Sequence, residues 1–318
     1  MKCCLLILSI CFPGFAFSCI WINGVTLDGD IARINAHSDF DRLSYAFAKT
    51  PTEKIDEIRK YQAREQDSID PFQSREQIAV INLLEGDTGQ AIEILKTNEE
   101  ESPGKYSTAA NLGTAYELHG DLDSAIEWIS EGIRRNPDSH HGTEWLHLRI
   151  LKTKQALQKD PSYLESNDVV QLPELKTSET IVLEGENLNA EDIQHSIVYQ
   201  LNERLLFIKS DDPVIANLLE TLAEINTHII TLESAIDILE LAKSFAPERT
   251  AHYDAMIEEY RGIIKQAKFN RMVRRSVLDI TIAAGLILFL IYSYKRKWFF
   301  LSSVDRDNYL REKRSGRV

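Results

Sequence analysis

Two consecutive stretches of the chain are copies of one pattern: FQSREQIAVINLLEGDTGQAIEILKTNEEESPGK at residues 72–105 and YSTAANLGTAYELHGDLDSAIEWISEGIRRNPDS at residues 106–139. A glycine followed by an aspartate stands at the same place in both copies, at Gly86-Asp87 and at Gly120-Asp121. Glycine readily adopts the backbone conformation that ends a helix, and aspartate can cap the helix that follows. The pattern therefore predicts two consecutive helix–turn–helix units.

A repeat of about 34 residues with this pattern resembles the tetratricopeptide repeat. The family's first-helix tryptophan is replaced here by Ala109. The resemblance implies paired antiparallel helices that meet at small residues, with Gly113 facing Ala125. It also implies a concave face, lined by the first helices of the units, on which a peptide or helix of another protein lies. The residues that carry the resemblance in the second copy are Leu112, Gly113, Tyr116, Ala125, Ile129, Gly132 and Pro137.

A second block of helices follows, because residues 214–247 fit the same template with Leu222-Ala223, Ala235 and Pro247. The two blocks are out of phase, since the distance from Pro137 to Pro213 is not a whole number of periods. The predicted fold class is an all-α, tetratricopeptide-like helical repeat solenoid in two blocks. We expect repeats with a capping helix (140–158) over residues 71–158, an irregular linker with one short strand (180–184) over residues 159–190, and the second block over residues 191–276.

The region 19–70 is expected to hold a short β-hairpin and helices. The hairpin prediction rests on residues 20–27, where Asn23-Gly24 suits a two-residue type I′ turn between apolar strands. An isolated hairpin is marginal in water, so it must pack against other elements. Residues 38–48 and 51–65 are expected to be helical.

Residues 1–18 read as an export signal, with Lys2, a short apolar run and small residues flanking Phe17. Cleavage after Ser18 would leave Cys19 as the first residue. We expect plain cleavage, and lipidation of Cys19 is the alternative, because a cysteine at this place resembles a bacterial lipoprotein signal. No cysteine follows Cys19, which removes thiol catalysis and cysteine metal clusters from the body of the protein.

Residues 277–294 form the other apolar segment, and we expect them to be a transmembrane helix. A helix of this length spans about 27 Å, close to the roughly 30 Å of bilayer hydrocarbon. Basic residues flank both ends of this segment, so charge alone does not orient it. The export signal then predicts an acidic body outside the cell membrane, periplasmic or extracellular, and a basic cytoplasmic tail over residues 295–318.

The formal net charge of −13 is unevenly distributed. Residues 19–276 hold 27 lysines and arginines against 45 aspartates and glutamates. A body this acidic repels phosphate backbones, so we expect no nucleic-acid partner.

Candidate chemistry is sparse. His140, Glu144 and His147 follow helical spacing, and two histidines with a carboxylate can bind iron or zinc, but we expect a solvated or groove-facing surface and no metal or other cofactor. The phosphate-loop, metalloprotease and serine-hydrolase motifs are absent from the sequence. The alternatives to a binding protein are an envelope hydrolase or metal enzyme with its site in the hairpin and linker, or a signalling component acting through the basic tail.

The sequence therefore predicts a non-enzymatic scaffold of a bacterial envelope that binds a partner protein in the repeat groove and a membrane through residues 277–294. Trp145 is a possible anchor, because partly exposed aromatic residues often dominate interface energy, although core packing is an equally good interpretation. Only Asn111 matches the family's carboxylate clamp. The groove residues that we expect to face a partner are Glu76, Ser107, Asn111, Thr114, His141 and Trp145.

Overall fold

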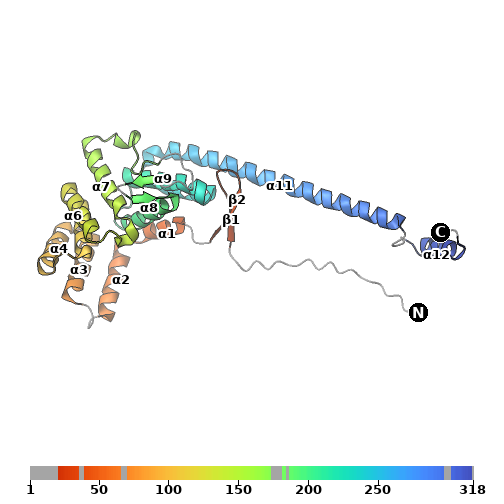
Figure 1. Cartoon of the computed structure of the whole chain (residues 1–318). Helices are drawn as coiled ribbons and strands as arrows, with labels where there is room; N and C mark the ends of the chain where they lie inside the picture. The colour runs from red at the N-terminus through yellow and green to blue at the C-terminus, as the bar shows by residue number, and fades with distance from the viewer. Residues whose placement is uncertain are drawn as a thin grey trace. The chain divides into compact units, whose positions relative to one another are not determined.

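A computed structural model describes most of the chain, and Figure 1 shows its elements. The export signal over residues 1–18 and Cys19 lie outside the described residues, as do parts of the expected linker and tail. The chain divides into two compact units, Met1–Arg261 and Gly262–Val318. The described residues are 21–35, 39–65, 70–172, 181–183, 186–296 and 302–316.

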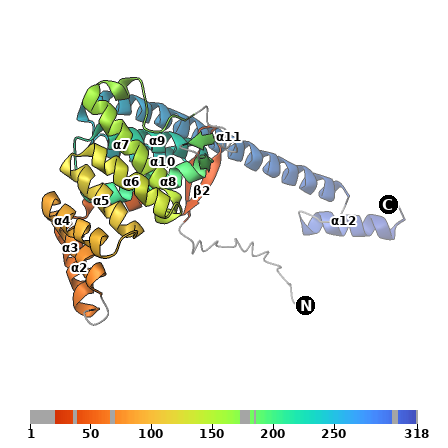
Figure 2. The ribbon, with the colours of Figure 1, turned by 60° about the vertical axis from the view of Figure 1, so that its left-hand side comes forward.

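The first block consists of two helix pairs that follow one another in both views (Figures 1 and 2). Gly86 and Gly120 end the first helix of each pair with φ of 85° and 90°, the left-handed conformation that glycine adopts without strain. Asp87 and Asp121 then cap the second helices through their side chains. The predicted helix–turn–helix units are confirmed as α3 (Pro71–Glu85), α4 (Thr88–Glu101), α5 (Tyr106–His119) and α6 (Leu122–Arg135).

Small residues allow the paired helices to approach closely. Ala79, Ala91 and Ala125 are fully buried. A Cβ atom placed on Gly113 would lie 2.3 Å from Cδ1 and 3.3 Å from the backbone nitrogen of Ile129, so a larger residue would force Ile129 or the helices themselves to move. The close approach of α5 and α6 that the resemblance implied is present, with Ile129 as the nearest neighbour of Gly113 where Ala125 was expected.

The segment after α6 starts differently from the expected helix over residues 140–158. His140 and His141 have φ of 47° and 59°, so the chain makes a left-handed turn before α7 begins at Glu144. Gly142 continues this turn with φ of 71°. The elements that follow α6 are η1 (Ser139–Gly142), α7 (Glu144–Lys159), η2 (Tyr163–Glu165), β3 (Ile181–Leu183) and β4 (Glu186–Leu188). Strand β3 lies where one strand was expected, at residues 180–184, and β4 was not expected.

The second block packs around the largely apolar helix α9 (Pro213–Ile229), whose buried side chains include Leu218, Leu222 and Ala223. Asp212 caps α9 and Thr231 caps α10 (Leu232–Ala242), each through a side-chain oxygen. The helices α9 and α10 pack against each other as a pair, which agrees with the template seen in residues 214–247. Its elements are α8 (Ala190–Arg204), α9 (Pro213–Ile229), α10 (Leu232–Ala242), η3 (Pro247–Arg249) and the beginning of α11 (Thr250–Lys295).

A short N-terminal hairpin is present, but its turn is not at Asn23-Gly24. Strand β1 (Trp21–Val25) runs through these residues and pairs with β2 (Ile31–Asn35) in antiparallel register. The reversal lies between them, where Gly29 has φ of 81°. The glycine at position 24 serves packing instead, because its Cβ would lie 2.3 Å from Cγ2 of Thr231.

The N-terminal elements join the two blocks. Helix α1 (Asp39–Ala48) packs against α8 and α10, whereas α2 (Pro51–Arg64) packs against α3. The Lys209 ammonium lies within 3.2 Å of the carbonyl oxygens of Ala46, Phe47, Lys49 and Leu205. This lysine ties the end of α1 to the end of α8.

The second unit contains the rest of α11 and the helix α12 (Ser303–Arg314). Apolar side chains of α11 such as Ile280, Leu288 and Phe289 are more than half exposed. The helix is long and apolar enough to cross a membrane.

Candidate functional site

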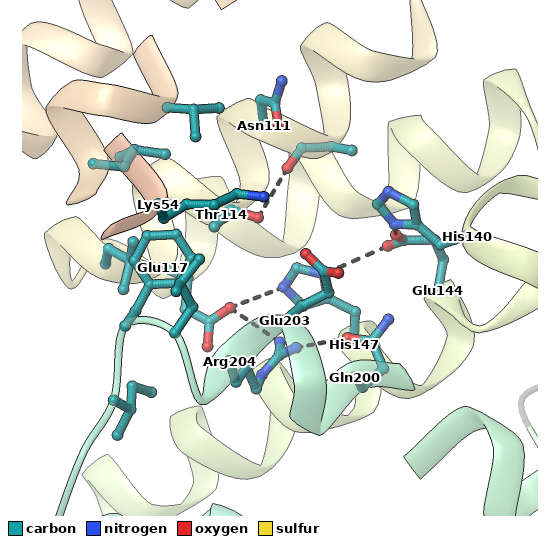
Figure 3. A pocket seen from close by; sticks show the side chains of 17 residues that line it. Lys54, Asn111, Thr114, Glu117, His140, Glu144, His147, Gln200, Glu203 and Arg204 are labelled. Atoms are coloured by element: carbon teal, nitrogen blue, oxygen red, sulfur yellow. Dashed lines mark hydrogen bonds and ion pairs between the residues drawn. The ribbon is translucent and has the colours of Figure 1, made fainter. Parts of the chain in front are cut away.

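A pocket opens on the inner side of the first block, between helices far apart in the sequence (Figure 3). Asn111 and Thr114 of α5, both predicted groove residues, line it. Val80 and Leu83 of α3 face it from the neighbouring pair, and Lys54 from α2. The pocket holds about 180 Å³.

The opposite wall comes from the second block. Gln200, Glu203 and Arg204 at the end of α8 line the pocket, followed by Phe207 and Ile208. Phe207 also packs against the buried cluster of α3, α4 and α5. The C-terminal end of α8 and the residues after it therefore cover part of the concave surface that a partner was expected to use.

Glu117 is the centre of a buried charge network at one side of the pocket. Its carboxylate accepts hydrogen bonds from His147 Nε2 at 2.8 Å, Lys154 Nζ at 2.9 Å and Arg204 Nη2 at 3.2 Å. Its side chain is 7% exposed. Burial alone would raise the pKa of Glu117, but Arg204, Lys154 and His147 hold it well below its ordinary value.

Arg204 carries this network from one block to the other. Its Nη1 donates a 2.6 Å hydrogen bond to Oε1 of Gln200. The amide of Gln200 in turn donates to Oγ1 of Thr143 at 3.1 Å. Helix α8 is thus joined to α5 through Glu117 and to the start of α7 through Thr143.

A second buried carboxylate, Glu144, lies at the N-terminus of α7. It is 2% exposed and accepts hydrogen bonds from Tyr106 Oη at 3.1 Å and from Nδ1 of His140. Nδ1 of His147 lies 3.5 Å from its other oxygen. Burial alone would raise the pKa of Glu144, but His140 and His147 hold it well below its usual range. The hydrogen bond to Glu144 raises the pKa of His140 in return.

These contacts hold the left-handed turn in place. Consecutive left-handed residues other than glycine are strained, and such strain persists only where surrounding contacts fix it. The imidazole of His140 is fixed by Glu144 and Tyr106, and Thr143 N donates to its backbone carbonyl at 3.2 Å. His141 packs its ring against His195 and Tyr199 of α8, with centroids 5.9 and 5.5 Å apart.

The predicted trio of His140, Glu144 and His147 is therefore brought together and lines the pocket, which fits the groove-facing expectation and not the solvated one. Glu144 and His147 are buried, and His140 precedes the helix. Both histidines contact carboxylate oxygens. In the part of the chain that the structure describes, no group of three or more metal-binding side chains is arranged to hold an ion.

The other predicted groove residues lie away from the pocket lining. Trp145 is 5% exposed and packs in the core, and its Nε1 has no hydrogen-bond partner among the described residues. Glu76 is half-buried, and burial raises its pKa. His141 is exposed beside α8, and Ser107 is half-buried near Glu76.

Sequence reasoning missed the pocket residues that come from outside the repeats: Lys54, Gln200, Glu203, Arg204 and Phe207. The one available signal was the apolar periodicity of residues 193–208, which indicated a helix with a buried face. It gave no reason to place that helix against α5.

Together, the fold and the site define a tetratricopeptide-like helical-repeat protein. No family model matches the chain, and no curated protein matches it. Among solved structures, the crystal structure of MamA is 14% identical and covers 65% of this chain and 98% of its own, with a TM-score of 0.26. At that TM-score the similarity adds no argument to the fold described above.

Proposed function

We propose that the chain is a non-enzymatic interaction scaffold, held in an envelope membrane by α11, that binds a partner protein on the inner face of its first block. The observation that carries this proposal is the pocket between α3, α5 and α8. Val80, Leu83 and Phe207 give part of it an apolar wall, and polar and charged side chains of α5, α7 and α8 line much of the rest. Binding sites usually combine apolar walls with polar groups that fix the orientation of what binds.

The volume of the pocket limits what can enter it. A cavity of roughly 150 Å³ accommodates benzene, and drug-sized ligands need roughly 300 Å³ or more. At about 180 Å³, the pocket accommodates one apolar side chain rather than a whole helix. A partner peptide or helix would therefore insert one residue and lie with the rest across the rim.

Polar groups at the rim support this arrangement. The side chains of Asn111 and Glu203 make no hydrogen bond within the described part of the chain, and Lys54 Nζ is 4.0 Å from Oε2 of Glu57. An amide, a carboxylate and an ammonium group are thus available to a peptide backbone or to polar side chains. A peptide that binds a groove with micromolar affinity has a binding free energy on the order of −8 kcal/mol. Anchoring both proteins in one membrane would raise the effective concentration of the partner, and with it the fraction of pockets that are occupied.

The cellular setting belongs to the same proposal. The export signal over residues 1–18 and the apolar part of α11 support a body exported to the periplasm or cell surface, with residues 295–318 in the cytoplasm. A basic tail suits the anionic inner leaflet. In the alternative in which Cys19 is lipidated, its lipid is a second anchor.

The test is crosslinking in native membranes followed by mass spectrometry of the captured proteins. Asn111→Trp fills the mouth of the pocket from a half-exposed position, and Glu127→Trp adds the same bulk to the exposed side of α6. We expect a partner captured by the parent and by Glu127→Trp to be lost from Asn111→Trp. Identical capture by all three would refute the pocket as the binding site.

A further inference from the structure

The part of α11 that precedes the apolar segment is strongly basic. Between Glu259 and Asp279 the sequence has no acidic residue. The body before it is acidic, so the sign of the charge changes after Glu259, ahead of the apolar segment that begins at residue 277. The basic residues in this interval are Arg261, Lys265, Lys268, Arg271, Arg274 and Arg275.

Three of these side chains form a cluster on one side of the helix. Arg271, Arg274 and Arg275 are spaced at i, i+3 and i+4, which places them together. All three are exposed, and they make no ion pair within the residues that the structure describes. On the other side of the same turns, Phe269 and Val273 are 54% and 42% exposed. This segment is therefore amphipathic.

The depth of these arginines can be compared with the layers of a bilayer. At about 1.5 Å per residue, Arg275, Arg274 and Arg271 lie about 3, 4.5 and 9 Å along the helix from Val277. The headgroup layer is roughly 5–8 Å thick on each side of the hydrocarbon. With Val277 at the edge of the hydrocarbon, all three guanidinium groups reach the phosphates. Lys265, about 18 Å from Val277, lies beyond the headgroups.

We propose that Arg271, Arg274 and Arg275 bind the phosphodiester headgroups of anionic phospholipids on the body side of the membrane. The proposal rests on the membrane anchoring proposed above. Guanidinium groups match phosphate oxygens with paired hydrogen bonds, which makes arginine well suited to this role. Phe269 and Val273 occupy the boundary between headgroups and acyl chains.

Continuity with the apolar segment selects lipid over other acidic partners. No Gly or Pro interrupts residues 263–284, and α11 is continuous from Thr250 to Lys295. An inserted helix therefore holds its arginines permanently at the level of the phosphates. A soluble acidic partner would have to compete with that high local concentration of phosphate.

The experiment is native mass spectrometry of the full chain in detergent with equal amounts of phosphatidylglycerol and phosphatidylcholine. The test variant is Arg271→Gln/Arg274→Gln/Arg275→Gln. The matched control, Arg59→Gln/Lys60→Gln/Arg64→Gln, removes the same charge from exposed positions of α2 in the body. Each basic residue near an anionic surface contributes on the order of a fivefold preference, so the test variant should lose more than tenfold of the preference for phosphatidylglycerol. The α2 control should keep most of that preference.

The inference would be overturned if the parent showed no preference for phosphatidylglycerol, or if the two variants lost that preference equally. It would also be overturned if equimolar glycerol phosphate displaced the lipid, which would indicate a simple anion site. Failure of the anchoring proposal is recognised separately. In that case the full chain is extracted from membranes by alkaline carbonate. A chain that resists carbonate but shows no lipid preference contradicts only the present inference.

Discussion

His147 and Glu117, thirty positions apart on α7 and α5, form a buried pair in which Nε2 lies 2.8 Å from the carboxylate and each side chain is 7% exposed. Lys154 and Arg204 complete the charge balance around Glu117. This pair joins two helices of the first block, and through Arg204 it also joins the second block.

Removing the carboxylate should therefore destabilise both blocks together. Glu117→Gln leaves Arg204 and Lys154 without their shared counter-ion. Removing one partner of a buried ion pair typically lowers the free energy of unfolding by roughly 3–5 kcal/mol. We expect a single unfolding transition at lower urea concentration. Glu127→Gln, on an exposed position of α6, is the control and should leave the midpoint unchanged. An unchanged midpoint for both variants would contradict the role assigned to Glu117.

The His140–Glu144 contact predicts a defined pH dependence. The folded pKa of His140 is raised above its ordinary value of 6.5, so its stabilising effect is complete below pH 6.5 and is lost as pH rises through the folded pKa. The folded pKa of Glu144 is lowered from 4.5, so its effect is complete above pH 4.5 and is lost as pH falls towards the folded pKa. The pair is therefore most stabilising between pH 4.5 and pH 6.5.

Urea denaturation of the parent and of His140→Gln at pH 5.5 and 8.5 measures this effect. The difference in unfolding free energy between them should be larger at pH 5.5. The opposite order would show that His140 is not the protonated partner of Glu144. His228→Gln, at a position outside the network, serves as the comparison.

The tight approach of α5 and α6 predicts a strong size effect at Ala125. Ala125 is fully buried, so Ala125→Leu must push the helices apart, and overpacking typically costs about 1–3 kcal/mol. Because repeats depend on their neighbours, the damage should extend to α4 and α7. Glu127 is exposed, so Glu127→Leu should be nearly neutral. Thermal melts that show equal midpoints for Ala125→Leu and the parent would refute the assigned register.

The hairpin should detach when Gly24 is enlarged. Gly24→Val places a side chain where Thr231 already lies, whereas nothing near Gly89 obstructs an added methyl group. We expect faster hydrogen exchange over residues 21–35 in Gly24→Val. Gly89→Ala lies in the first turn of α4 and should leave exchange in the hairpin unchanged.

The proposed topology predicts the outcome of limited proteolysis. Protease added to spheroplasts should degrade the acidic body and spare a fragment that contains residues 295–318. Complete protection of the body would overturn export. If Cys19 carries lipid, Cys19→Ser should accumulate as the larger precursor, whereas unchanged processing would support plain cleavage.

The helices of the first block could be predicted because their signals are local. Gly86 and Gly120 end helices, and Asp87 and Asp121 begin the next ones, with no help from distant residues. The left-handed turn at His140 and His141 had only a weak signal, because residues other than glycine seldom adopt this conformation, even though histidine does so more often than most. A contact that holds the turn is made by the buried carboxylate of Glu144, four positions after His140.

The candidate site could be predicted only in part, for the same reason. Asn111 and Thr114 face the pocket because the first helices of a repeat line its inner side. Arg204 lines the pocket from α8 and contacts Glu117, which is 87 positions away in the sequence. Periodicity gives the buried face of a helix but not the element that covers it. Trp145 illustrates this limit, because an apolar ring at such a position suits both a core and an interface.

The docking of the N-terminal hairpin sets the order in which the chain can finish folding. The backbone amide of Val25 donates to Oε2 of Glu233 at 2.8 Å, across 208 positions of sequence. Ribosomes add roughly 5–20 residues per second, so this partner is made on the order of 10–40 s after the hairpin. During that interval both strands have free edges and α10 does not yet exist. A holding chaperone that shields residues 21–35 would prevent premature pairing between nascent chains. The hairpin, although made before the helix it packs on, would be among the last elements to reach its native contacts.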